Sequence, residues 1–286
     1  MRNNKYKILD VSDWKVEDEG KGYSESYWLI DLETRRRGLF KRPKYNSHYD
    51  FYYGEHWAEK IVAEIGKEIN LNMPDVDLAV YDHKKGCLSH IFLNKGESLK
   101  EGVEVLSVDV TKQNRDMYYL ENILEDIEEY DLIEDFIYLL LFDAFIGQTD
   151  RHEENWGIII SKSSDNNMEL APIYDNASSL GRNLLPDKIE KIFQDDNFFN
   201  SYIEGCKSCI KLKNNFDPTQ FDVVNFIYKN YNVLYMDFIN KLVKLKDDDI
   251  RRIVNKIPKN FMSLKQKKMV LKILIERKKR LFSIIE

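Results

Sequence analysis

The chain has 286 residues, enough for one large domain or two lobes, and its 43% apolar and 13% aromatic residues can fill a substantial core. Its formal net charge of −6 gives no overall positive field, which argues against nucleic acid and anionic membranes as partners. The first residues lack an apolar signal segment, and the longest apolar run is too short to span a bilayer, so we expect a cytoplasmic protein.

The first third of the chain predicts short strands around one helix. Runs rich in β-branched and aromatic residues mark the expected strands at 27–31, 38–42, 75–82 and 87–93. Between them, residues 55–69 repeat apolar side chains every three or four positions and stop before the sequence LNMP, which indicates one amphipathic helix. We therefore expect a small strand-rich lobe at 1–93.

Helical patterns dominate after about residue 94. The expected helices lie at 118–146, around 219–245 and at 264–285. One stretch differs, because the turn-rich sequence KSSDNN separates WGIIIS from MELAPI and predicts a hairpin over 156–174 centred on Asp165. The expected class is α+β, with a larger and mostly helical lobe at 94–286.

A polar cluster follows directly on an apolar helix, where GQTDRHEENWG at 147–157 comes after FIYLLLFDAFI. In a hairpin centred on Asp165, Asn155 lies opposite Asp175, and both are expected close to Asp150. Mg²⁺ takes oxygen ligands and is usually held by one or two protein groups plus substrate phosphates, which fits an Asn/Asp pair. Asp150 is then available to accept a proton from an attacking hydroxyl. Protein kinases divide these roles in the same way, with a base, an Asn on metal and a second metal-binding Asp.

At these residues the sequence resembles the HipA-like kinases, bacterial serine/threonine protein kinases best known as toxins of toxin–antitoxin pairs. The family pattern G-x-T-D-x-H-x-x-N, followed by L-A-P-x-Y-D, is met at every position between 147 and 155 and between 170 and 175. The resemblance implies a bilobal protein-kinase-like fold that uses ATP and Mg²⁺. It implies Asp150 as the catalytic base and Asn155 and Asp175 as metal ligands. His152 is either a histidine that holds the loop through hydrogen bonds or a catalytic helper at the phosphates.

The resemblance is fainter in the first half of the chain. There GLFKRP supplies Lys41 as the candidate for pairing the nucleotide phosphates, and the helix at 55–69 matches the family's helix that ends before a Pro. Glu59 is expected to orient Lys41, with Glu55 as the alternative because the two share a helical face. The sequence GKGYS is expected to form the phosphate-covering loop, with Gly22 and Ser24 against the nucleotide.

Two further expectations concern the nucleotide. Its adenine is expected in the cleft between the lobes against backbone groups near His90–Leu93, which makes His90 and Phe92 nucleotide-binding candidates. A serine in the family's phosphate-covering loop can itself be phosphorylated, so we expect autophosphorylation at Ser24 or Ser26. The alternative is that both are surface serines of a turn.

Two other classes of function compete with a protein kinase. Phosphoinositide kinases share the DRHxxN motif, but the acidic net charge and the residues Tyr174-Asp175-Asn176 argue against a lipid kinase. An inactive pseudokinase or binding module would be marked by the loss of a catalytic residue, yet Lys41, Asp150, Asn155 and Asp175 are all present.

The expected partners are a protein substrate with a Ser or Thr acceptor and, from the resemblance, an antitoxin-like protein. Better-known members carry further N-terminal residues that contribute to antitoxin docking. In this sequence the kinase core begins almost at Met1, which argues against stable docking of an antitoxin and leaves both alternatives open, with and without an antitoxin-like partner.

Overall fold

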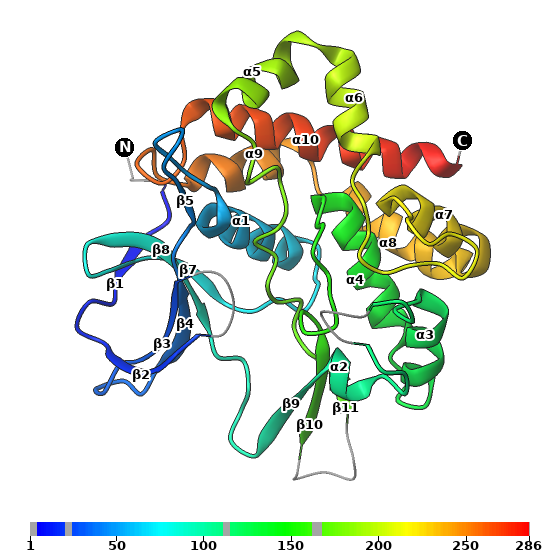
Figure 1. Ribbon diagram of the computed structural model, residues 1–286, viewed down its shortest axis with the longest axis horizontal. Coiled ribbons are helices and arrows are strands. Elements are labelled where there is room, and N and C mark those ends of the chain that lie inside the picture. The colour runs from blue at the N-terminus through cyan, green and yellow to red at the C-terminus, as the bar shows by residue number, and fades with distance from the viewer. Residues whose placement is uncertain (1–4, 21–24, 111–114, 162–167, 286) are drawn as a thin grey trace. The chain divides into compact units, whose positions relative to one another are not determined.

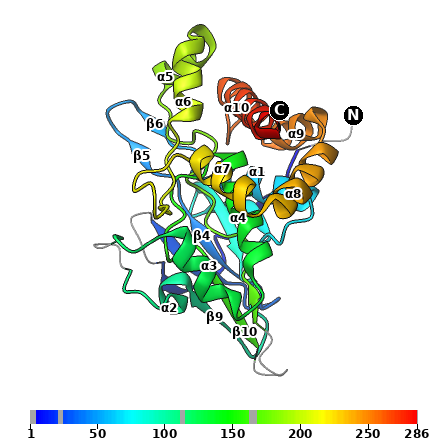
Figure 2. The same ribbon diagram turned by 90° about the vertical axis from the view of Figure 1, so that its right-hand side faces the viewer.

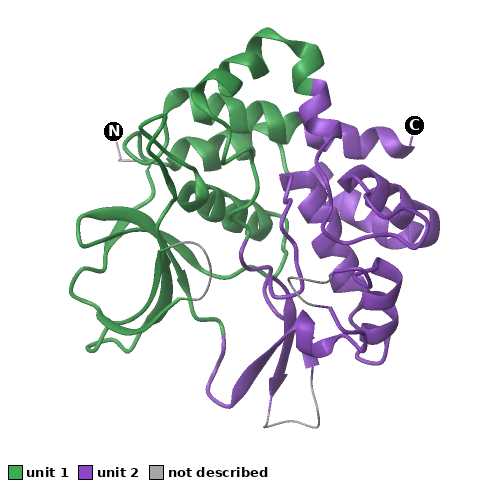
Figure 3. Cartoon of the chain, viewed as in Figure 1, with its two compact units in different colours: residues 1–92, 176–199, 245–275 green, residues 93–175, 200–244, 276–286 purple. Residues whose placement is uncertain are grey.

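The computed structural model describes residues 5–20, 25–110, 115–161 and 168–285. The chain divides into two compact units, each assembled from stretches that are separate in sequence (Figure 3). Unit 1 contains residues 1–92, 176–199 and 245–275, and unit 2 contains residues 93–175, 200–244 and 276–286. Two late stretches therefore belong with the N-terminal strands, although the sequence predicted two consecutive lobes. The α+β class is confirmed by the order of helices and strands.

Unit 1 is built on a six-stranded sheet with the order β1-β7-β8-β4-β3-β2 (Figure 1). Its strands are β1 (Ile8–Asp10), β2 (Lys15–Glu19), β3 (Ser26–Ile30), β4 (Arg37–Lys41), β7 (Val76–Tyr81) and β8 (Lys84–His90). β1 pairs with β7 in parallel, and all other neighbours are antiparallel. β3, β4, β7 and β8 confirm the four predicted strands. β2 was not predicted, because its sequence KVEDE is exposed at every position and shows no apolar alternation.

One helix, α1 (Glu55–Glu68), confirms the predicted amphipathic helix and packs against β7 and β8. Its Ala63 forms an apolar cluster with Val76 and Cys87. Leu88, the next residue of β8, belongs to a second cluster with Val11, Leu29, Phe40 and Ala79. Because neighbouring residues of a strand point to opposite faces, the sheet is covered by apolar side chains on both sides.

The remaining elements of unit 1 are short or come late in the chain. They are β5 (Tyr45–Asn46), β6 (Phe51–Tyr52), α5 (Pro186–Gln194) and α9 (Asp247–Lys256). Two further helices, α6 (Asp196–Glu204) and α10 (Leu264–Phe282), contribute residues to both units. α10 confirms the helix predicted at 264–285, whose last residues form a 3₁₀ turn at Ser283–Ile285.

Unit 2 is mostly helical. Its helices are α2 (Gly102–Val105), α3 (Leu120–Glu128), α4 (Ile133–Ile146), α7 (Gln220–Asn230) and α8 (Asn232–Lys244). α4 is buried continuously from Phe136 to Ile146 and packs against α7 and α8. The single helix predicted at 118–146 is two helices, separated by a turn in which Asp131 has a φ of 59°. None of the helices in the described ranges has the length and apolar character needed to cross a membrane.

A three-stranded antiparallel sheet carries the predicted hairpin of unit 2. Its strands are β9 (Glu97–Glu101), β10 (Gly157–Ser161) and β11 (Met168–Leu170), with α2 beside β9 and β10 (Figures 1 and 2). The hairpin is confirmed, but its predicted register was wrong. Ile158 pairs with Leu170, whereas a hairpin centred on Asp165 would pair Ile158 with Pro172. The observed register places Ile158 opposite Leu170, and both side chains are buried.

Candidate active site

The candidate loop begins where α4 ends, at Gly147. This glycine has a φ of 70°, a left-handed conformation that L side chains rarely adopt and that commonly ends helices. The chain then leaves the buried helix, and Thr149 and Asp150 are exposed. The predicted base therefore stands on an exposed loop between α4 and β10.

Asn155 closes this loop. Its side-chain Nδ2 donates a hydrogen bond to the Asp150 carbonyl at 2.7 Å, and its backbone N donates to the His152 carbonyl at 2.9 Å. Since the amide nitrogen is used in this way, the amide oxygen Oδ1 is the atom that Asn155 can offer to a hard cation.

Asp175 follows β11 after the extended segment that contains Ala171, Pro172 and Ile173. It has a φ of 54°, a left-handed conformation that Asp tolerates better than most residues. Such backbone conformations concentrate at functional sites, where surrounding contacts maintain them. One of these contacts is a hydrogen bond of 2.9 Å from the Gln148 side chain to the Asp175 carbonyl.

Gln148 connects the two candidate aspartates. Its Nε2 donates to the Asp175 carbonyl, and its Oε1 accepts from the Asp150 backbone N at 3.2 Å. The side chain is only 2% exposed. The two backbone contacts bring Asp150 and Asp175 together even though the hairpin register does not pair position 155 with 175.

Arg151 forms a second set of buried contacts with the loop, the Arg151 clamp. Its guanidinium binds both carboxylate oxygens of Asp143 at 2.8 and 2.9 Å, and its Nη1 donates to the carbonyls of Asn155 and Tyr174, each at 2.7 Å. Burial disfavours the charged form of both side chains. It raises the pKa of Asp143. The pKa of Arg151 is raised by Asp143, although burial by itself would lower it. The paired hydrogen bonds favour the charged pair. Arg151 thus joins α4, the loop and the segment before Asp175.

His152 lies half-buried within the loop. Burial lowers the pKa of His152, against the opposing effect of Asp150, and so favours the neutral imidazole. Its Nδ1 accepts a hydrogen bond of 3.2 Å from the Glu154 backbone N. This contact supports the interpretation in which His152 holds the loop, and its role at the phosphates stays a prediction.

Other side chains of unit 2 also form hydrogen bonds with the loop. Arg115 binds the buried Glu153 through hydrogen bonds of 2.8 and 3.3 Å. The Tyr118 hydroxyl donates to the Arg151 carbonyl at 3.1 Å and accepts from Trp156 Nε1 at 2.9 Å. The backbone of the loop is therefore bound at several points by side chains of unit 2.

Lys41 is the last residue of β4 in unit 1 and is half-buried. It lies opposite Ser26 of β3 and Cys87 of β8 in the sheet. Ser26 is 7% exposed, and its carbonyl accepts a hydrogen bond from Gly20 N at 2.8 Å. The residues Gly22 and Ser24, predicted to cover the phosphates, lie outside the described residues.

The two glutamates proposed to orient Lys41 differ in their surroundings. Glu55, in the first turn of α1, forms an ion pair with Arg182. Glu59 is 1% exposed on the same helix, which packs against β8, the neighbour of the strand that bears Lys41. Because Arg182 engages Glu55, Glu59 remains the better candidate for Lys41.

His90 and Phe92 lie where the chain passes from unit 1 to unit 2. The backbone N of His90 donates to the Asp75 carbonyl, and that of Ile91 donates to the Arg37 carbonyl. The His90 ring is 2.9 Å from an Asp77 carboxylate oxygen. The roles of His90 and Phe92 at the adenine stay predictions.

The oxygen atoms near the loop fit a Mg²⁺ ion that takes only a few of its ligands from the protein. Within the described ranges, no group of three or more His, Cys, Asp or Glu side chains has the arrangement of a metal site. An Asn amide oxygen and an Asp carboxylate match the small protein contribution that Mg²⁺ receives when phosphates supply the other ligands. Asn155 and Asp175 therefore fit Mg²⁺ bound together with a nucleotide.

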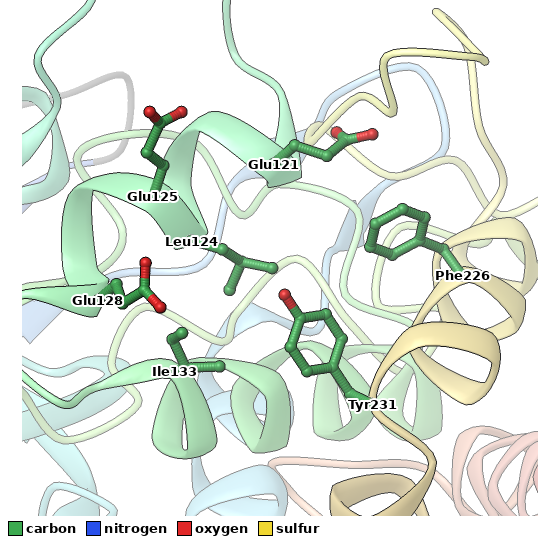
Figure 4. A pocket seen from close by; sticks show the side chains of 7 residues that line it. All are labelled: Glu121, Leu124, Glu125, Glu128, Ile133, Phe226 and Tyr231. Carbon is green, nitrogen blue, oxygen red and sulfur yellow. The ribbon is translucent and has the colours of Figure 1, made fainter.

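Unit 2 has a separate concavity of about 230 Å³ (Figure 4). Glu121, Glu125 and Glu128 of α3 surround a floor formed by Leu124, Ile133, Phe226 and Tyr231. Burial and the nearby carboxylates raise the pKa of Tyr231. The pocket contains none of the predicted site residues, so we assign it no part in the chemistry.

The sequence reasoning missed Asp143, Gln148 and Arg151, which hold the loop without belonging to the predicted catalytic set. A signal for one of them was present, because Asp143 interrupts the apolar run at 136–146. A carboxylate in a helix that is buried on all sides requires a partner. Gln148 and Arg151 occupy variable positions of the motif, where the pattern predicts no role.

The loop and the fold together define the class of protein. The profile of the HipA-like C-terminal domain matches residues 15–198, and the chain belongs to that family. Among solved structures, the Helicobacter pylori proinflammatory kinase CtkA has a TM-score of 0.77 and 17% identity, over 98% of this chain and 100% of that chain. HipA of Shewanella oneidensis MR-1, solved with HipB and its operator DNA, has a TM-score of 0.60 and 13% identity, over 96% of this chain and 67% of that chain. No curated protein matches the sequence.

The likeness to CtkA confirms the predicted protein-kinase-like fold, because nearly the whole of both chains superimposes. At this level of identity it shows the fold alone. The family match covers the strands of unit 1 from β2 onward, the loop and Asp175, so it supports a HipA-type kinase.

Proposed function

We propose that the chain is an ATP- and Mg²⁺-dependent kinase that phosphorylates serine or threonine residues of a protein. The observation that carries this proposal is the loop itself. Gln148 binds the backbones of Asp150 and Asp175, and Arg151 binds the backbones of Asn155 and Tyr174. Such positioning is what phosphoryl transfer needs most, since its loose transition state requires little covalent chemistry from the protein.

The roles of the loop residues follow from their placement. Asp150 is exposed and can orient the acceptor hydroxyl and accept its proton. The Asn155 amide oxygen and the Asp175 carboxylate would hold Mg²⁺. When bound, this ion supplies positive charge to the transferring phosphates. Arg151 and Gln148 maintain the spacing of these groups through buried hydrogen bonds.

In unit 1, we assign Lys41 to the nucleotide phosphates and Glu59 to the orientation of Lys41. The burial of Glu59 and the packing of α1 against β8 support this assignment. The engagement of Glu55 by Arg182 removes the main competitor. Phe92 and His90 mark the region proposed for the adenine.

Autophosphorylation at Ser24 or Ser26 remains part of the proposal. Ser26 begins β3 and is buried with its Oγ close to Gly20, so a kinase could reach its hydroxyl only after this packing opens. A phosphate on either serine would add about −1.5 to −2 charges where the phosphates of ATP are proposed to lie. Mass spectrometry after prolonged incubation with Mg-ATP tests this, and an active preparation without phosphate on either serine would remove the switch.

We also propose an antitoxin-like partner. The Shewanella oneidensis structure contains HipA together with HipB and operator DNA, and this chain belongs to the same domain family. Coexpression with the product of a neighbouring gene, followed by purification, would test for a complex.

The decisive experiment for the proposed function separates protein from lipid acceptors. The purified chain is incubated with labelled ATP and Mg²⁺, either with a mixture of proteins or with phosphoinositide vesicles at physiological salt. We expect label in protein and none in lipid, because the net charge of −6 gives little attraction to anionic bilayers. Label in lipid together with cosedimentation on the vesicles would favour the lipid kinase. Absence of transfer to either acceptor by folded protein would favour a pseudokinase.

A further inference from the structure

Gln148 is itself anchored from the interior of unit 2. Its backbone carbonyl accepts a hydrogen bond from the Nε2 of Gln220, the first residue of α7. The Oε1 of Gln220 accepts from Nη2 of Arg277 on α10. Gln148, Gln220 and Arg277 are 2%, 4% and 0% exposed. A buried series of hydrogen bonds therefore runs from α10 to the loop that bears Asp150.

Arg277 fixes one end of this series. Its Nε donates to the Ala144 carbonyl at 2.6 Å, in the last turn of α4, and its Nη1 donates to the Ile203 carbonyl of α6 at 3.2 Å. A cation at the C-terminal end of α4 is favoured by the helix dipole. Arg277 thus binds the helix directly before the loop and, through Gln220, the loop itself.

The direction of each hydrogen bond in the series is determined by a group that can only donate, Arg277 at Gln220 and the Asp150 backbone N at Gln148. A guanidinium has only donors, so it must face the oxygen of the Gln220 amide, which leaves the nitrogen of that amide to face the Gln148 carbonyl. At Gln148 the Asp150 backbone N is likewise only a donor and takes Oε1, so Nε2 faces the Asp175 carbonyl. No amide in the series can rotate without placing two donors or two acceptors against each other.

We propose that Gln220 and Arg277 are positioning residues for the phosphoryl transfer site, which set the placement of Asp150 and Asp175 through Gln148. This inference rests on the proposed function. The physical reason is that displacement of a catalytic group by about 1 Å can cost about a hundredfold in rate. A buried and fully bonded network also resists such displacement better than an exposed loop.

The variant that separates positioning from simple packing is Gln220→Glu. It keeps the size of the side chain and an oxygen for Arg277, and it makes an ion pair with that residue. It replaces the donor that faces the Gln148 carbonyl by an acceptor, so it breaks the series at one link. Gln266→Glu is the matched control, because Gln266 is also buried in α10 and its Oε1 accepts from Ser263 N at 2.9 Å, a contact that the substitution keeps.

The first measurement is amide hydrogen exchange of the protein without substrate. We expect Gln220→Glu to accelerate exchange of the peptide 147–156 by about tenfold, while the strands of unit 1 and the Gln266→Glu variant keep the wild-type pattern. Unchanged exchange at 147–156, or equal acceleration in the control, would overturn the proposed network. If Gln220→Glu does not fold, Gln220→Met keeps the volume without a charge and serves with the same measurements.

The second measurement is turnover. We expect kcat to fall tenfold to a hundredfold in Gln220→Glu and the KM for Mg-ATP to rise as well, since the network positions Asp175, the proposed metal ligand, together with Asp150. Faster loop exchange with wild-type kcat would overturn the positioning role. The exchange result does not depend on activity. If the wild-type protein transfers no phosphate, the proposed function is refuted, and the exchange measurement alone decides whether the network holds the loop.

Discussion

Lys41 in unit 1 and Asp150 in unit 2 are positioned by different kinds of interaction. Lys41 ends a strand in the middle of a sheet, where backbone pairing with β3 and β8 and apolar clusters on both faces fix its Cα. Asp150 stands on an irregular loop whose backbone is bound by buried polar side chains, above all Gln148 and Arg151. Packing is distributed over many small contacts, whereas a polar network depends on a few bonds.

This difference suggests that unit 1 should tolerate single substitutions around Lys41 better than unit 2 tolerates them around Asp150. A buried donor or acceptor that loses its partner costs about 1 to 3 kcal/mol, and an unpaired buried charge costs more. The predictions below test this contrast, beginning with the groups that the two regions are proposed to present to the nucleotide.

The largest effect is expected for Asp175→Asn. The amide keeps the volume but removes the negative charge proposed to bind Mg²⁺, so Mg²⁺-dependent ATP binding should be lost and turnover should fall by about a thousandfold or more. Calorimetric titration with Mg-ATP measures the binding. The control is the same substitution at an exposed position of α5, Asp187→Asn, which should keep wild-type turnover. Wild-type turnover of Asp175→Asn would refute the metal assignment.

Asp150→Asn should separate catalysis from binding within the same loop. A positioned base contributes about 10² to 10⁴ in rate, so kcat should fall by that factor while the affinity for Mg-ATP is retained. Single-turnover kinetics together with nucleotide titration make the distinction. If nucleotide binding were lost first, the roles of Asp150 and Asp175 would have to be exchanged.

Arg151→Met tests the clamp under the loop. It leaves the Asp143 carboxylate buried without its cation, which should lower the free energy of unfolding by about 3 to 5 kcal/mol. Combining it with Asp143→Leu should restore most of the stability, since the unpaired charge is removed. Turnover should stay low in the double variant, because the bonds to the Asn155 and Tyr174 carbonyls are still missing. Wild-type turnover there would show that the loop does not need the clamp.

A buried histidine gives unit 1 a pH dependence of its own. Burial lowers the pKa of His56 to about 4, below its ordinary value of about 6.5. The unfolded chain therefore takes up this proton first, so stability is fully present above pH 6.5 and is lost as the pH falls toward 4, by up to about 3 kcal/mol. Denaturant unfolding between pH 7 and 4.5 should show a shallower decline for His56→Leu than for wild type. The exposed His48→Leu is the control, and parallel declines in all three proteins would refute the assignment.

The smallest effects should distinguish the two glutamates of α1. Glu59→Gln is expected to lower kcat about tenfold to a hundredfold by loosening Lys41. Glu55→Gln should change kcat less than about threefold and should instead lower stability, because it weakens the pair with Arg182. Both variants need kcat and a thermal midpoint. The opposite ranking would make Glu55 the partner of Lys41.

Much of the fold could be read from local patterns in the sequence. Four strands of unit 1, the helix α1 and the hairpin of β10 and β11 have apolar periodicities that match their structures. The elements that were missed lack such patterns. β2 is exposed throughout, β9 pairs only along one edge of β10, and α3 and α4 looked like one helix because a short turn separates two apolar stretches.

The sequence by itself identified the candidate site residues, since Asp150, Asn155 and Asp175 stand in the pattern that protein kinases use for a base and two metal ligands. It did not determine how they come together. The predicted register was wrong by two residues, since Ile158 pairs with Leu170 in the structure. The contacts that join the site residues come from Gln148 and Arg151. Gln148 is bound by Gln220, 72 residues further along the chain, and Gln220 is bound by Arg277, another 57 residues further. A hydrogen bond over such a separation has no local pattern, because its partners meet only when α4, α7 and α10 pack.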